Sequence, residues 1–321
     1  MKAGFIGLGT MGASMAANLQ KGFQTPGNTV LVHDIRKEAA APHIANGAVW
    51  ADSPAALAAE CDIIFSSLPG PMEFEAVSYG DSGILAGVHK DAAYFDLTTN
   101  SPTTMRKAHA EYVTKGAHLF DAPVSGGPRG AFTGKLAIWC GGDREVFDKW
   151  KPVLDTIGDQ ASYIGPIGAG SVAKLVHNCA GYAVQAALAE VMTLGVKGGV
   201  EPAELWDAVR MGALGRARTF DRLGDQYLVD SYDPPAFALK LALKDMTLAT
   251  DLGRELGVPM RMANVAYADM LEGMNRGWAA RDSRSPMILQ NERAGVKIAV
   301  DPKRIKESLE RDPPYGEKPK A

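Results

Sequence analysis

The sequence predicts an α/β fold in which a doubly wound, mainly parallel sheet forms the first half of the chain and helices alone form the second half. Three observations support this prediction. Short apolar runs alternate with helical patterns up to about residue 164, a glycine-rich turn joins the first run to the first helix, and the strand signal stops near Gly165. Strands that alternate with helices in this way are typical of βαβ units and therefore of a parallel sheet.

Helices in the first half begin at recognisable caps. Ser53 precedes Pro54 and Ser101 precedes Pro102, so each pair places a serine at the N-cap and a proline at the first helical position. We predict strands over residues 3–8, 29–33, 63–68, 92–97, 118–121, 136–140 and 163–164, and helices between them that include 11–21 and 102–115.

The second half shows helical patterns only. A long apolar-periodic stretch runs from Val172 to about Lys197, Glu201-Pro202 marks a helix start, and Gly257-Val258-Pro259 marks a stop followed by a new start. Further helices are predicted over 202–211, 237–256, 260–273 and 286–294. We therefore expect a Rossmann-type domain of residues 1–164, an all-helical domain of residues 165–296, and an extension of residues 297–321 with a short helix and a loose tail.

Composition argues against several classes of function. The 321 residues are 46% hydrophobic with a net charge of −3, which fits a globular protein and argues against a nucleic-acid partner. Cys61, Cys140 and Cys179 lie far apart without a CxxC motif, so neither a disulfide framework nor a cysteine-based zinc site is expected. No run of 18 apolar residues occurs, and glycines interrupt the apolar start. We expect a cytoplasmic protein without a membrane partner.

The segment GLGTMG at residues 7–12 fits the dinucleotide-binding pattern GxGxxG. It follows the first predicted strand and opens the first predicted helix, which is the context the pattern requires. Gly7 permits the tight turn, Gly9 lets a pyrophosphate approach the backbone, and Gly12 lets helix and strand pack closely. The helix N-terminus then offers N–H groups and a partial positive charge to phosphates.

Asp34 ends the second predicted strand, 22 residues after Gly12. A carboxylate at this position accepts hydrogen bonds from ribose hydroxyls and repels a 2′-phosphate, so NAD is favoured over NADP. Arg36 lies two residues later and could weaken that preference. A flavin or S-adenosylmethionine can use a similar first turn, and the rest of the chain must decide among these ligands.

Two further segments contain candidates for the chemistry. Ser125, Gly126 and Gly127 follow a predicted strand, where a hydroxyl and exposed N–H groups can form a nest for a carboxylate, although an ordinary loop can have this composition. Lys174 and Asn178 are four residues apart and share one face of a predicted helix that begins where the two domains should meet. Such a lysine can exchange a proton with a substrate hydroxyl, but spacing alone also fits a solvated lysine.

Four segments, taken together, resemble one protein family. They are GLGTMGASMAANLQKG at 7–22, DAPVSGG at 121–127, GPIGAGSVAKLVHN at 165–178 and LKDMTLATD at 243–251. In this order they resemble the cofactor signature, substrate loop, catalytic helix and KDLxLAxD segment of the β-hydroxyacid dehydrogenases. That family includes 3-hydroxyisobutyrate dehydrogenases, tartronate semialdehyde (glyoxylate/succinic semialdehyde) reductases and, more distantly, 6-phosphogluconate dehydrogenases. The resemblance covers residues 1 to about 296.

The resemblance implies a role for each matching residue. Lys174 is implied to be the general acid/base, Asn178 to hold the substrate hydroxyl or carboxylate, and Ser125, Gly126 and Gly127 to bind the carboxylate. Lys244, with Asp245 beside it, is implied to lie near the nicotinamide and the substrate. The cofactor-binding residues are then Gly7, Gly9, Thr10, Met11, Gly12, Asp34, Leu68, Pro69, Thr99 and Lys244.

The sequence departs from the family pattern at several positions. His177 stands where many relatives have asparagine, and it is either a packed histidine or a participant in the site. Arg129, Arg216 and Arg218 are either surface arginines, which we favour, or groups that hold a second substrate anion. Their roles stay open in the sequence.

These features predict an NAD-dependent oxidoreductase that interconverts a small β-hydroxy acid and its aldehyde or keto acid, without a metal. Two alternatives remain. Imine reductases share the fold but generally have another residue at the position of Lys174. A cofactor-binding module without chemistry would bind the coenzyme without turnover. The sequence does not specify which hydroxy acid is used, the physiological direction or the size of the expected homo-oligomer, a dimer or a tetramer.

Overall fold

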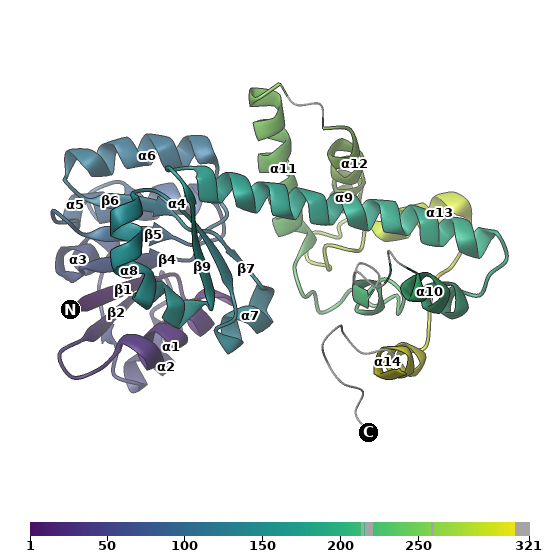
Figure 1. Cartoon of the computed structure of the whole chain (residues 1–321), viewed down its shortest axis with the longest axis horizontal. Coiled ribbons are helices and arrows are strands. Elements are labelled where there is room, and N and C mark those ends of the chain that lie inside the picture. The colour runs from purple at the N-terminus through teal and green to yellow at the C-terminus, as the bar shows by residue number, and fades with distance from the viewer. Residues whose placement is uncertain (213–214, 216–220, 258–259, 312–321) are drawn as a thin grey trace. The chain divides into compact units, whose positions relative to one another are not determined.

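The computed structural model describes residues 1–212, 215, 221–257 and 260–311. The chain divides into two compact units, Met1–His177 and Asn178–Ala321. Figure 1 shows that the first unit contains a sheet with helices on both faces and that the second contains helices. The predicted fold class is therefore confirmed.

The sheet of the first unit is mainly parallel. Within the described residues it has nine strands in the order β3-β2-β1-β4-β5-β6-β8-β7, with β9 paired to β8. Pairs from β3 to β6 along this order are parallel, and β8 is antiparallel to both β6 and β7. The strand bounds are β1 Lys2–Ile6, β2 Thr29–His33, β3 Val49–Trp50, β4 Ile63–Ser66, β5 Ala93–Asp96, β6 His118–Asp121, β7 Val124–Ser125, β8 Ala137–Gly141 and β9 Gln160–Gly165.

Alternate residues of the central strands point to opposite faces and build two apolar layers. On one face Phe95 stacks on Phe65 and Phe120, with ring centroids 5.8 Å and 4.2 Å apart, under α1 and α8. On the other face Tyr94 and Leu119 pack under α3, α4, α5 and α6. The helix bounds are α1 Gly12–Phe23, η1 Lys37–Ala40, α2 Ala41–Ala45, α3 Pro54–Glu60, α4 Pro71–Ser78, α5 Ile84–Gly87, α6 Pro102–Thr114, α7 Gly127–Thr133 and α8 Arg144–Ile157.

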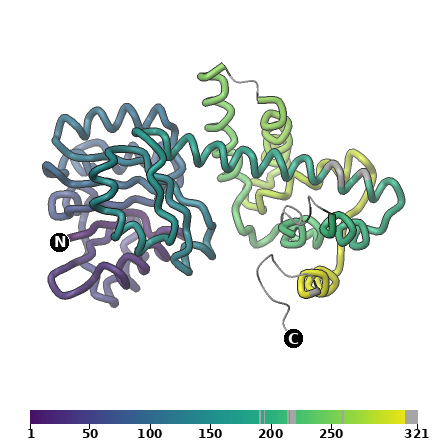
Figure 2. Tube along the Cα trace, viewed as in Figure 1, coloured from purple at the N-terminus to yellow at the C-terminus, as the bar shows by residue number. Residues whose placement is uncertain are grey.

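Helix α9, Ala169–Lys197, begins in the first unit and continues into the second, and Figure 2 shows its trace. The helix predicted over 202–211 is confirmed with the same bounds, and the predicted short helix in the extension is α14. Val258 and Pro259, and the predicted loose tail from residue 312, lie outside the described residues.

None of the helices in the described part of the chain has the length and apolar character that a membrane span needs. The remaining bounds are α10 Pro202–Met211, η3 Asp221–Gly224, α11 Leu239–Glu255, α12 Arg261–Asn275, α13 Met287–Ala294 and α14 Pro302–Arg311.

The turn from β1 into α1 depends on glycine at two positions. Gly7 has φ +88°, a conformation that residues with a Cβ rarely adopt. A Cβ at Gly12 would lie 1.9 Å from the carbonyl oxygen of Gly7, so the helix can approach the strand only without a side chain there. A Cβ at Gly9, in contrast, would meet no atom within 4 Å, so this side of the turn is open.

These glycines predict two different mutant behaviours. Gly12→Ala should lower the free energy of unfolding by about 1–3 kcal/mol, because the methyl group overlaps backbone. Gly9→Ala should change it by no more than about 0.5 kcal/mol, yet weaken NADH binding about tenfold or more, because the methyl group occupies the open side where a pyrophosphate would approach. Urea unfolding followed by circular dichroism and an NADH fluorescence titration measure the two effects. Wild-type NADH affinity in Gly9→Ala would contradict the assignment of Gly9.

Candidate active site

The residues predicted to bind the coenzyme follow the carboxyl ends of neighbouring strands. The turn of residues 7–12 follows β1, Asp34 follows β2, Leu68 and Pro69 follow β4, and Thr99 follows β5. Because these strands are parallel, their carboxyl ends lie at one edge of the sheet. The strand order reverses between β1 and β4, and crevices for ligands form at such a reversal.

Asp34 holds the first turn against the end of β2. Its Oδ2 accepts a hydrogen bond from the backbone N–H of Leu8 at 2.6 Å, and its Oδ1 accepts one from the N–H of Arg36 at 2.8 Å. The carboxylate is 8% exposed, whereas the guanidinium of Arg36 is largely exposed and its Nε lies 3.8 Å from Oδ1. The open side of Gly9, the fixed carboxylate and the start of α1 together fit a dinucleotide.

A buried network joins the loops that follow β4 and β5. The N–H of Leu68 donates to the hydroxyl of Thr98 at 3.1 Å. Asp96 accepts hydrogen bonds from the Ser66 hydroxyl at 2.7 Å and from Nδ2 of Asn100 at 3.2 Å. Burial raises the pKa of Asp96 to about 6, and the hydrogen bonds from Thr98, Ser66 and Asn100 oppose that rise. Asp96 therefore fixes two loops that the sequence assigns to the coenzyme, a role that the motif pattern did not reveal.

The predicted carboxylate nest lies at the end of the short strand β7. Ser125 is half-buried, and Gly126 and Gly127 are exposed. Both glycines have positive φ values, +142° and +62°, and a Cβ at Gly126 would lie 2.8 Å from a methyl carbon of Leu136. Val124 and Ser125 form a strand paired with β8 where the sequence indicated only a loop, because two residues are too few to show an alternating pattern.

Two contacts join this segment to the helix that contains Lys174. At the end of β6 the buried carboxylate of Asp121 accepts hydrogen bonds from the N–H groups of Gly168 at 2.7 Å and Ser171 at 2.5 Å. Six residues further along α9, Nε2 of His177 lies 3.1 Å from the Ser125 hydroxyl.

The ring of His177 also packs against Trp139 of β8, with ring centroids 5.2 Å apart. His177 is thus in contact with the predicted substrate loop, and the sequence had left its role open. Ser171, Lys174 and His177 are spaced by three residues and share one side of α9. Lys174, which is half-buried, therefore lies between two points at which α9 is bonded to residues 121–125.

Asn178 and Lys244 meet at one carboxylate in the second unit. Asp245, which is 2% exposed, accepts a hydrogen bond from Nδ2 of Asn178 at 2.6 Å and pairs with Nζ of Lys244 at 2.9 Å. A carboxylate can only accept, so the Asn178 amide must present Nδ2 to Asp245 and direct Oδ1 elsewhere. The sequence placed Asp245 beside Lys244 but did not predict that it orients Asn178.

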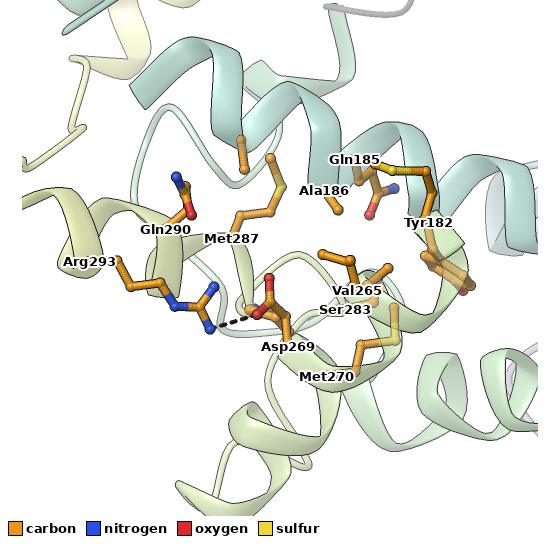
Figure 3. A pocket seen from close by; sticks show the side chains of 14 residues that line it. Tyr182, Gln185, Ala186, Val265, Asp269, Met270, Ser283, Met287, Gln290 and Arg293 are labelled. Atoms are coloured by element: carbon orange, nitrogen blue, oxygen red, sulfur yellow. Dashed lines mark hydrogen bonds and ion pairs between the residues drawn. The ribbon is translucent and has the colours of Figure 1, made fainter. Parts of the chain in front are cut away.

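A pocket lies elsewhere in the second unit, among α9, α12 and α13 (Figure 3). Tyr182, Met270 and Met287 are among the residues that line it, and Arg293 donates to Asp269 at 2.6 Å. None of the predicted catalytic, substrate-binding or coenzyme-binding residues lines this pocket.

The sequence left the roles of three arginines open, and the structure describes one of the three. Arg129 lies on α7 and is exposed. Arg216 and Arg218 lie outside the described residues.

Comparison with known proteins assigns both halves of the chain to one family. A family model described as the NAD binding domain of 6-phosphogluconate dehydrogenase matches residues 2–165. A second, described as NAD-binding of NADP-dependent 3-hydroxyisobutyrate dehydrogenase, matches residues 168–289. A 2-(hydroxymethyl)glutarate dehydrogenase from Eubacterium barkeri is 33% identical over 299 residues, which cover 93% of this chain and 98% of that protein.

Solved structures agree with this placement. The 3-hydroxyisobutyrate dehydrogenase of Mycobacterium tuberculosis with L-serine has a TM-score of 0.77 and 27% identity, covering 90% of this chain and 98% of that one. An imine reductase from Pseudomonas sp. is more distant, with a TM-score of 0.57 and 14% identity over 90% of this chain and 98% of that one, and shares the fold alone. The predicted resemblance is thus confirmed: the chain belongs to the β-hydroxyacid dehydrogenase family, whose members are NAD(P)-dependent oxidoreductases that act on CH–OH groups.

Proposed function

We propose that this protein catalyses the reversible, NAD-dependent oxidation of a small β-hydroxy acid to its aldehyde or keto acid, with Lys174 as the general acid/base. The observation that supports this most strongly is the attachment of α9 to residues 121–125 on both sides of Lys174. Because Lys174 and His177 are three residues apart on α9, we place the lysine amine on the side of the helix that faces the proposed carboxylate nest. A proton acceptor and an anion site held on one scaffold are what a hydroxy acid needs for oxidation.

Each proposed residue has a separate task. When bound, the nicotinamide coenzyme supplies a two-electron acceptor for the hydride of the carbinol carbon. Ser125 and the N–H groups of Gly126 and Gly127 hold the substrate carboxylate. Nζ of Lys174, in its neutral form, accepts the hydroxyl proton, and in the reductive direction it returns that proton to the carbonyl oxygen. Oδ1 of Asn178, directed away from Asp245, accepts a hydrogen bond from the substrate hydroxyl.

The relatives define a panel of substrates to test. It contains 2-(hydroxymethyl)glutarate, 3-hydroxyisobutyrate and L-serine, which are named with related proteins, together with glycerate and 4-hydroxybutyrate. We further propose a homodimer or homotetramer in the cytoplasm, with a domain division near residue 164 and an extension from residue 297. A non-catalytic module, the alternative from another class of function, would increase NADH fluorescence without turning over any member of the panel.

Replacement of Lys174 should separate catalysis from binding. Lys174→Met should lower kcat by about 10²–10⁴-fold, because the proton acceptor is lost, and leave the NADH dissociation constant within about twofold of wild type. The matched control is Lys197→Met at the other end of α9, where Nζ donates to the carbonyl of Ala294. Steady-state kinetics with 3-hydroxyisobutyrate, or the best substrate of the panel, gives kcat. Near-normal turnover by Lys174→Met would rule out Lys174 as the acid/base.

Asp34 should set the coenzyme preference. We expect kcat/KM for NAD to exceed that for NADP by about tenfold or more, because the Asp34 carboxylate repels a 2′-phosphate. Two like charges about 4 Å apart repel by roughly 1 kcal/mol in bulk water and by roughly 4 kcal/mol near a protein surface. Asp34→Asn removes the charge and should reduce the ratio, whereas Arg36→Ala should increase it. Parallel measurements with both coenzymes decide the matter, and equal or better use of NADP by the wild type would refute the role given to Asp34.

A further inference from the structure

The start of α9 is held by a buried carboxylate that belongs to a different element. Asp121 lies at the end of β6, is 1% exposed, and accepts hydrogen bonds from the N–H groups of Gly168 and Ser171 at 2.7 Å and 2.5 Å. Bonds from N–H groups to an ionised acceptor are stronger than those between neutral groups, and a negative charge is favourable at a helix N-terminus. Two bonds from backbone N–H groups to one buried carboxylate fix both the direction and the rotation of the first turn.

Two glycines allow this close approach. A Cβ at Gly170 would lie 2.1 Å from the carbonyl oxygen of Trp139 and 2.6 Å from that of Asp121. A Cβ at Gly141 would lie 2.4 Å from Oδ1 of Asp121 itself. The first turn of α9 thus packs directly on the backbone of β6 and β8, and any side chain at these positions would push the helix away from the carboxylate.

The segment of residues 121–125 contacts α9 a second time, further along the helix. Ser125 is four residues after Asp121 and lies 3.1 Å from Nε2 of His177. From Ser171 to His177 the helix rises by about 9 Å, and Lys174 lies halfway along that span. A displacement of one residue along the helix would rotate its side chains by about 100°, so the position of the lysine amine depends on how the first turn is held.

We propose that Asp121 is a positioning residue for the reaction: by binding the N–H groups of Gly168 and Ser171 at the start of α9 it fixes the rotation and axial position of the helix, and hence the position of Lys174 relative to Ser125. The inference rests on the proposed function, because it takes Lys174 as the acid/base. Burial raises the pKa of Asp121 to about 6, while the hydrogen bonds from Ser171 and Gly168 oppose that rise, so the group is mainly ionised at pH 8.

Two chemically different variants test this role. The side-chain amide of Asp121→Asn has one oxygen, which can accept, and one NH₂ group, which can only donate. The NH₂ group would face a backbone N–H that is also a donor, so one of the two bonds is lost. Gly170→Ala keeps the carboxylate and displaces the helix by overlap with backbone. The matched control is Asp143→Asn, because Asp143 caps α8 by accepting from the N–H groups of Glu145 and Val146 at 2.9 Å and 3.1 Å. All four proteins, wild type included, are assayed at pH 8 with NAD and 3-hydroxyisobutyrate, or the best substrate of the panel.

We expect kcat to fall by about 10–100-fold in Asp121→Asn and in Gly170→Ala, as small misplacements of a catalytic group produce losses of this size. The NADH dissociation constant should stay within about twofold, and amide hydrogen exchange over residues 168–174 should accelerate about tenfold. Asp143→Asn should keep kcat and leave exchange over residues 168–174 unchanged, because its amide oxygen can accept both of the bonds that Oδ1 of Asp143 accepts. If Asp121 had only a structural role, Asp121→Asn and Gly170→Ala would lose thermal stability, but kcat would not fall while the NADH dissociation constant stays unchanged.

Hydrogen exchange makes the test independent of the substrate. Unchanged exchange over residues 168–174 in Asp121→Asn would overturn the inference whether or not a substrate has been found. Wild-type kcat in Asp121→Asn and Gly170→Ala, together with an inactive Lys174→Met, would overturn it and leave the proposed function intact. Near-normal turnover in Lys174→Met would instead remove the proposed function, on which the catalytic part of the inference rests.

Discussion

The close contact between the first turn of α9 and the ends of β6 and β8 determines what the rest of the first unit can do. It exists because Gly141 and Gly170 have no side chains and because the Asp121 carboxylate satisfies two N–H groups that a helix cannot satisfy itself. Burying that carboxylate costs free energy, which the two hydrogen bonds and the favourable position at the helix N-terminus offset. The result is a lysine-bearing helix whose start is fixed by the strand that leads into the predicted substrate loop.

Buried carboxylates also hold the loops at the edge of the sheet where we expect the coenzyme to bind. Asp34 accepts a hydrogen bond from the N–H of Leu8, and Asp96 accepts from Ser66 and Asn100, so buried acidic side chains at the ends of β2 and β5 each hold a neighbouring loop in place. In the second unit Asp245 orients the amide of Asn178. Carboxylates therefore hold the groups that we assign to coenzyme and substrate, whereas the proton acceptor that we propose for the reaction is of another kind, the amine of Lys174.

The sequence predicted the elements better than their contacts. Alternating apolar runs and helix caps predicted the parallel sheet, and α10 has the bounds expected from Glu201-Pro202, because these signals are local. The strand β7 was missed, since Val124 and Ser125 are too few to show a period. The bonds between Asp121 and Ser171 and between Ser125 and His177 join residues about fifty positions apart, and no local pattern encodes such pairs. The glycine motif and the Lys174 segment indicated candidate site residues, whose roles stay predictions, but not which acidic side chains are bonded to them.

The measurement that tests the central claim most directly is rescue of Lys174→Ala by added amines. With NAD and 3-hydroxyisobutyrate, or the best substrate of the panel, the account predicts that small primary amines restore turnover and that the restored rate increases with the basicity of the amine, because the amine replaces the missing proton acceptor. A variant that binds NADH normally but turns over as fast as wild type without any amine, or that no amine accelerates, would contradict the account.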